Sequence, residues 1–185
     1  MFRKKYSYTI WGILFTAVLG TLLHFLYEWS GELPLTALFS PVNESVWEHL
    51  KLLYFPFVLY TLWELFHASR DPAVFLPSRT IGLAAGLILI PLFFYSYTAV
   101  LGTNYLALDI TVFLLSILLA FFLSSLAERK AAYPNKDKVV SRLLPYLSLA
   151  VLILLSVLFI YFTFRAPRLP LFRDPVKRSE ERRVG

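Results

Sequence analysis

Histidine and acidic residues occur in the first third of the chain at spacings that suit joint chemistry. His24 and Glu28 are four residues apart, so on a helix both side chains leave the same face. Glu48 and His49 are adjacent, and because a helix turns by about 100° per residue, both can line one cavity but would not easily ligate one ion. Asp109 lies near the start of an apolar segment in the second half. Imidazole and carboxylate groups bind zinc, iron or manganese and also act as general acids and bases.

We therefore predict a polar pocket in which His24, His49 and Asp109 bind a divalent metal ion, with zinc as one candidate. Glu28 or Glu48 is the predicted catalytic base that activates a metal-bound water. The spacing does not match the HExxH pattern of zinc proteases, so composition carries this hypothesis. The remaining predicted pocket residues are polar or aromatic and lie in one short segment: Asn43, Glu44, Trp47 and Lys51.

Part of this set also has a purely structural interpretation. Asn43 and Glu44 fit the start of a helix, where capping and the helix dipole favour them. Glu44, Glu48 and Lys51 form a stripe at i, i+4 and i+7, in which the carboxylates can pair with the ammonium group. His24, His49 and Asp109 have no such local partner, which is why the functional hypothesis depends on them.

Three other features predict structure rather than chemistry. Glu64 and His67 are three residues apart and are expected to pair locally near the other end of their helix. Aromatic residues such as Tyr54 and Trp63 fit the belts found at membrane interfaces. The small residues of segment 82–86 predict a helix packing face.

Membrane-crossing helices must position these side chains. Of the 185 residues, 58% are hydrophobic and 17% aromatic, a balance that would leave a water-soluble globule covered with apolar surface. The apolar segments reach about 20 residues, the length at which a helix crosses about 30 Å of hydrocarbon. We predict an all-α polytopic transmembrane bundle, one membrane domain over 1–185, with five spans at about 8–29, 43–67, 80–100, 105–126 and 143–164.

The distribution of Lys and Arg predicts the orientation. Basic residues occur before the first span, in the loop 70–79 and in the charged loop 128–142, whereas the other two short loops hold none. The N-terminus is therefore expected inside, in a multi-pass protein of the cell membrane. The basic, proline-containing tail 165–185 is then an outer tail, and it would form a lid together with the apolar segment 35–41.

Composition also limits the partners. The chain has no cysteine, which excludes disulfides, thiolate metal sites and cysteine nucleophiles. The net charge of +6 comes from basic residues at the ends and loops, where they meet anionic lipid, so we expect no nucleic-acid partner. Membrane lipid and a second copy of the chain are the expected partners.

Segments 23–31 and 41–51, together with the tail 170–175, resemble a family of small prokaryotic membrane proteins of unknown function. The string NESVWEHLK at 43–51 is the specific part of this resemblance. The progestin and adipoQ receptors and the alkaline ceramidases likewise join histidines and acidic residues across helices. This chain lacks their seven spans and their histidine pairs at i and i+4, so they are an analogy only.

The leading functional hypothesis is metal-dependent hydrolysis of a lipid or another small amphiphile in a pocket that opens to the outer face. A transporter subunit coupled to ions or protons is the first alternative, because the same groups bind protons or substrate. A haem protein with His24 and His49 as axial ligands is another. The last is a scaffold subunit, in which none of the buried polar residues matters beyond folding.

Overall fold

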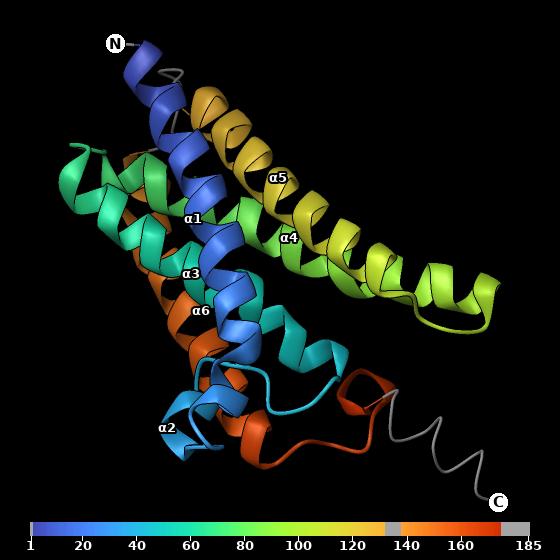
Figure 1. The fold of residues 1–185 in the computed structure, drawn as a ribbon. Coiled ribbons are helices and arrows are strands. Elements are labelled where there is room, and N and C mark those ends of the chain that lie inside the picture. The colour runs from blue at the N-terminus through green and yellow to red at the C-terminus, as the bar shows by residue number, and fades with distance from the viewer. Residues whose placement is uncertain (1, 132–137, 175–185) are drawn as a thin grey trace, which may run out of the picture.

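The computed structural model describes residues 2–131 and 138–174, with side chains from 7 to 131 and from 142 to 174. Every regular element in this part of the chain is helical, as predicted (Figure 1). Four helical segments are long and apolar enough to cross a membrane: Ser7–Trp29, Pro72–Leu101, Leu106–Ala131 and Arg142–Phe164. The elements are α1 (Phe2–Trp29), α2 (Pro34–Ala37), α3 (Val46–His67), α4 (Pro72–Leu101), α5 (Leu106–Ala131), α6 (Lys138–Phe164) and the 3₁₀ helix η1 (Pro170–Phe172).

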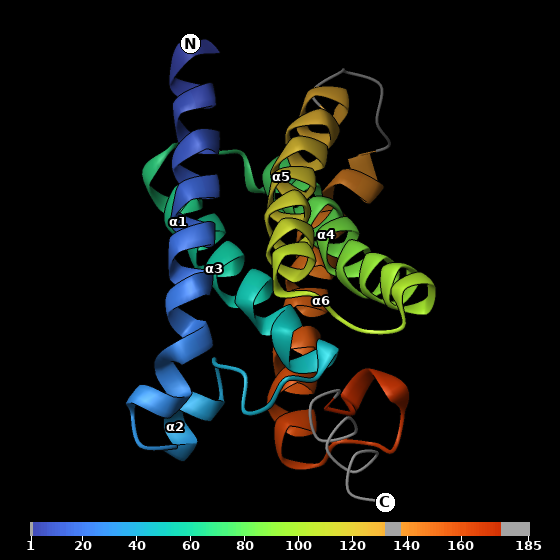
Figure 2. The same ribbon diagram turned by 45° about the vertical axis from the view of Figure 1, so that its right-hand side comes forward.

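Helix α3 corresponds to the second predicted span, 43–67, but its composition does not place it among those four. Glu48, Lys51 and Glu64 make it less apolar, yet all three side chains are buried. The helix crosses the bundle between α1 on one side and α4 with α6 on the other (Figure 2). The charges are buried because they are paired inside the protein, and α3 contributes more than any other helix to the core.

Helices α4 and α5 form a closely packed hairpin. A side chain at Gly82 would collide with the Ala120 carbonyl and with Ser124, and one at Gly86 would crowd the Ser116 carbonyl. The predicted packing face at 82–86 is therefore confirmed, because only glycine lets the two backbones approach so closely.

Two predicted loops are helical in part. Helix α4 begins at Pro72 rather than near residue 80, because Asp71 caps it by accepting a hydrogen bond from the Ala73 amide and proline is tolerated in a first turn. Helix α5 continues to Ala131, through charged residues that were assigned to the loop 128–142. Residues 132–137 of that loop, and 175–185 of the tail, lie outside the described part.

The centre of the bundle is a layer of large side chains from α3, α5 and α6. Leu53, Phe57, Ile117 and Phe121 are all inaccessible or nearly so. Tyr54 belongs to this layer, so its assignment to an interfacial belt was wrong. Its hydroxyl donates to the Leu152 carbonyl of α6 and lies within hydrogen-bond distance of the Ser156 hydroxyl, which satisfies the polar group inside the core.

Candidate functional site

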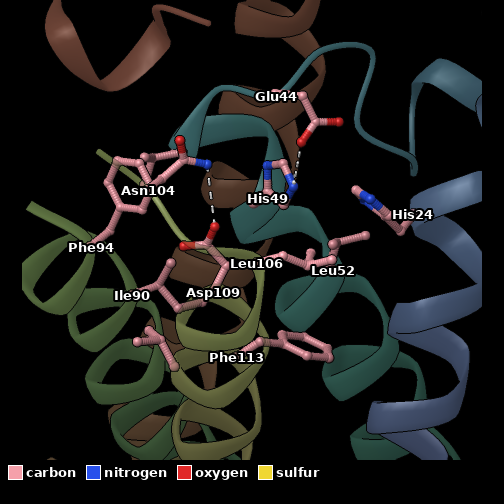
Figure 3. Close-up of a pocket in the computed structure, with 12 residues that line it drawn as sticks. His24, Glu44, His49, Leu52, Ile90, Phe94, Asn104, Leu106, Asp109 and Phe113 are labelled. Atoms are coloured by element: carbon pink, nitrogen blue, oxygen red, sulfur yellow. Dashed lines mark hydrogen bonds and ion pairs between the residues drawn. The ribbon is translucent and has the colours of Figure 1, made fainter. Parts of the chain in front are cut away.

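A pocket of about 170 Å³ lies between α1, α3, α4 and α5. It is at the end of the bundle that holds the last turn of α1, the first turn of α3 and the α4–α5 turn, which we call the site end (Figure 1). Apolar side chains form most of its wall, and four of its residues carry ionisable groups (Figure 3). The lining residues are His24, Glu44, Val46, His49, Leu52, Ile90, Phe94, Asn104, Leu106, Asp109, Val112 and Phe113.

Three of the ionisable side chains converge at the mouth of this pocket. His24 of α1, Glu44 before α3 and His49 of α3 each offer a ligand atom, and these atoms lie within 4.8 Å of one another. The two imidazole rings have centroids 5.2 Å apart, and His49 Nε2 is 3.4 Å from Glu44 Oε2. Two imidazoles and one carboxylate are a ligand set of catalytic zinc sites.

The chain entering α3 sets the position of Glu44 and His49. Ser45, rather than Asn43, caps the helix, with its hydroxyl accepting from the Glu48 amide at 3.4 Å. Asn43 instead accepts from the Ser45 amide at 2.9 Å and so shapes the preceding turn. Glu44 therefore precedes the helix and does not belong to a stripe with Glu48 and Lys51. This turn directs its carboxylate toward His49.

The tautomer of His49 is fixed by the backbone. Its Nδ1 lies 3.0 Å from the Ser45 carbonyl, which accepts only from a protonated nitrogen. Nε2, the other ring nitrogen, faces Glu44. A backbone carbonyl that orients a histidine in this way is typical of metal-ligating imidazoles. His24 Nδ1 is buried and has no hydrogen-bond partner among the described residues.

Asp109 reaches the same pocket from the first turn of α5 but lies apart from the three converging groups. Its carboxylate accepts a hydrogen bond from the Tyr97 hydroxyl and lies 3.5 Å from the Asn104 side-chain amide. Figure 3 shows Asp109 and Asn104 on one side of His49 and His24 on the other. The structure thus brings the three predicted metal ligands to one pocket, with Glu44 closer than Asp109 to the two histidines.

The other predicted site residues do not line this pocket. Glu28 is exposed on the last turn of α1. Glu48 and Lys51 face away from it and form a buried ion pair with an Nζ–Oε2 distance of 2.7 Å. Trp47 packs among aromatic rings of α6 and η1, with its centroid 4.8 Å from that of Phe172. Within the predicted lid, η1 of the tail therefore lies against the start of α3, and no residue of 35–41 or 165–174 lines the pocket.

A second group of charges, at the opposite end of the bundle, was not predicted. Glu64 is fully buried and pairs through one carboxylate oxygen with Arg70 and through the other with Arg79, rather than with His67. Arg70 also lies 3.4 Å from Glu128 of α5. His67 instead stacks on Trp63. One feature of the sequence could have indicated this cluster. The connection between α3 and α4 is short, residues 68–71, so α4 must fold back along α3, and this brings Arg79 opposite Glu64.

These features define the class of the protein as a helical integral membrane protein with a charge cluster near each end of its bundle, one partly exposed and one buried. The chain belongs to the DUF6512 family of unknown function, whose model matches residues 1–179. No curated protein and no solved structure matches it.

Proposed function

We propose that this protein binds a divalent metal ion through His24, Glu44 and His49 and uses it to hydrolyse a lipid or another small amphiphile. One observation carries the proposal. With Nδ1 committed to the Ser45 carbonyl, the Nε2 atom of His49 faces the Glu44 carboxylate at 3.4 Å. Two acceptors at this distance repel each other unless a cation or a proton lies between them. A proton alone accounts for this pair but leaves the convergence of His24 unexplained.

The ligand set supports catalysis rather than a structural metal. Structural zinc sites are closed by four protein ligands, whereas catalytic zinc takes three and keeps a position for water. Three side chains converge here, and the pocket lies beside them. A metal ion held there would lower the pKa of its bound water toward neutrality and polarise a carbonyl group.

The pocket wall supports an amphiphilic substrate. Leu52, Ile90 and Phe113 are among the apolar side chains that line it, and they suit an alkyl segment. Asp109 is the carboxylate on the far wall, so we assign to it the role of base in place of Glu28 and Glu48, which do not line the pocket. In this reaction water adds to a carbonyl carbon, the bond to the leaving oxygen or nitrogen breaks, and the proton passes to the leaving group.

Elemental analysis of detergent-purified protein tests the metal site. We expect a stoichiometric metal in wild type and its loss in His24→Ala, Glu44→Ala and His49→Ala. His67→Ala is the matched control, because this third histidine stacks on Trp63 far from the pocket. Equal, substoichiometric metal in all five proteins would refute the proposal.

We also propose that α3 is a fifth membrane crossing and that the N-terminus is inside. At 1.5 Å per residue its 22 residues span about 33 Å, enough for the hydrocarbon layer. The charges that make it less apolar are paired within the bundle. A reporter fused after Gly185 should then read extracytoplasmic, and a cytoplasmic signal would refute this count.

Transport is the second candidate, supported by the open pocket and by prolines within α3 and α4. It requires the buried layer of Leu53, Phe57, Ile117 and Phe121 to separate, because this layer fills the bundle centre. Zinc flux into proteoliposomes discriminates the two functions. The haem alternative gains no support, since the pocket of about 170 Å³ is smaller than the about 300–1,000 Å³ of usual cofactor and ligand sites.

A further inference from the structure

The segment 37–45, which we call the strap, connects α2 to α3 and carries Glu44 near its end. Beneath it lies Lys51, the most deeply buried charge at the site end, with no accessible surface. Its Nζ is 2.7 Å from Glu48 Oε2, 3.0 Å from the Ala37 carbonyl and 3.2 Å from the Ser40 carbonyl. All three ammonium donors are therefore used, two of them on the strap backbone.

Glu48 completes the attachment from the other direction. Its Oε2 also accepts from the Val42 amide at 3.1 Å, and its Oε1 accepts from the Thr163 hydroxyl of α6 at 3.3 Å. One ion pair on α3 thus holds the strap at three backbone positions and joins it to α6. The last of these positions, Val42, is two residues before Glu44.

Stability alone does not account for such a pair. Removing two charges from water costs about as much as their attraction returns, and apolar replacements of similar volume are often equally stable. Apolar side chains cannot, however, hold two carbonyls and one amide of a segment that, after Ala37 at the end of α2, has no regular structure of its own. The pair therefore supplies geometry, and the group whose geometry it sets is the carboxylate that faces His49.

We propose that Glu48 and Lys51 are positioning residues of the metal site, which fix the strap so that Glu44 stays within ligating distance of His24 and His49. This inference rests on the metal site of the proposed function. It also accounts for the residue types of segment 43–51. One face of the first turns of α3 presents His49 to the pocket, and an adjacent face carries the ion pair that holds the strap.

The test is the double variant E48Q/K51M, which removes both buried charges at similar volume. Thr61→Val is the matched control, since this buried α3 hydroxyl has no hydrogen-bond partner among the described residues and lies away from the strap. Three quantities are measured on detergent-purified protein: zinc affinity by competition with a chelator, amide hydrogen exchange of peptides covering 37–45 without metal, and the thermal unfolding midpoint.

We expect E48Q/K51M to bind zinc about 10- to 100-fold more weakly, the loss typical of residues that orient a ligand. Its strap amides should exchange faster than those of wild type, while the unfolding midpoint changes little. Thr61→Val should match wild type in zinc affinity and in strap exchange. Unchanged zinc affinity and unchanged strap exchange in a folded double variant would overturn the inference.

Two other outcomes are separable. If wild type binds no zinc, the proposed metal site is refuted, and this inference is overturned with it. Faster strap exchange in the variant would then show only that the Glu48–Lys51 ion pair fixes the strap. If E48Q/K51M does not fold, Thr163→Val removes the contact of Glu48 with α6, together with the hydrogen bond that this hydroxyl donates to the Phe159 carbonyl of its own helix. Weaker zinc binding by that variant at unchanged stability supports the inference, and unchanged binding overturns it.

Discussion

The two charge clusters of this protein, one near each end of the bundle, are built on opposite plans. At the site end, Glu44 and His49 keep 50% and 29% of their side-chain surface accessible, and three ligand atoms face a pocket. At the opposite end Glu64 is inaccessible, each of its carboxylate oxygens contacts an arginine, and the Arg79 guanidinium lies 4.8 Å from the Phe121 ring centroid. The first cluster is open to the pocket, whereas the second is buried and ion-paired, although Arg79 Nη1 has no hydrogen-bond partner among the described residues.

This difference separates charges that folding explains from charges that it does not. A buried carboxylate with two guanidinium partners has its desolvation compensated, and it joins α3 to α4 and to the turn between them. Two imidazoles and a carboxylate that converge without a cationic side chain, among the described residues that line the pocket, have no such explanation. Partnering, more than depth, is therefore the reason for proposing the site-end cluster as the functional one.

The largest expected effect is the loss of stability when the carboxylate of the buried cluster is replaced. Glu64→Gln leaves Arg79 buried without its carboxylate partner, so we expect the free energy of unfolding to fall by about 3–5 kcal/mol. Thermal unfolding in detergent measures this loss. Glu44→Gln is the matched control at the open cluster and should change stability by no more than about 0.5 kcal/mol. Equal losses in both variants would contradict the contrast between the clusters.

The second largest expected effect is the stabilisation of the folded protein by zinc. Zinc at 100 times its dissociation constant should stabilise the wild-type protein by about 2.7 kcal/mol, because it binds only the folded state. His24→Ala and Glu44→Ala should lose this gain, since each removes one of the three ligands. His67→Ala should retain it in full. A gain that survives in His24→Ala would mean that zinc binds elsewhere.

Much of this architecture could be predicted from the chain. Apolar length located the helices, although α4 begins about eight residues before its predicted start, and the glycines of 82–86 located a packing face, because both depend on local composition. The partners of Glu64 could not be predicted from spacing: Arg79 is 15 residues away and meets it only after the chain reverses. Glu44 was assigned to the pocket but not as a ligand, since its direction depends on a turn shaped by Asn43.

Asp109→Asn distinguishes the predicted ligand set from the observed one. The sequence favoured Asp109 as a ligand, whereas the structure places Glu44 with the two histidines. We expect the zinc affinity of the variant to fall by less than about 10-fold, the smallest loss typical of a residue that orients a metal ligand. Its hydrolytic activity should still fall, because Asp109 is the proposed base. Loss of zinc binding equal to that of His49→Ala would return Asp109 to the ligand set.

The smallest expected effect concerns Glu28, which the sequence favoured as a base because it shares a helix face with His24. Two side chains four residues apart on a helix share a face but lie one turn apart along its axis. In the structure, Glu28 is exposed and does not line the pocket. Glu28→Gln should therefore change unfolding by no more than about 0.5 kcal/mol and leave zinc affinity unchanged. A fall in hydrolysis with zinc still bound would show that the end of α1, rather than the start of α5, supplies the base.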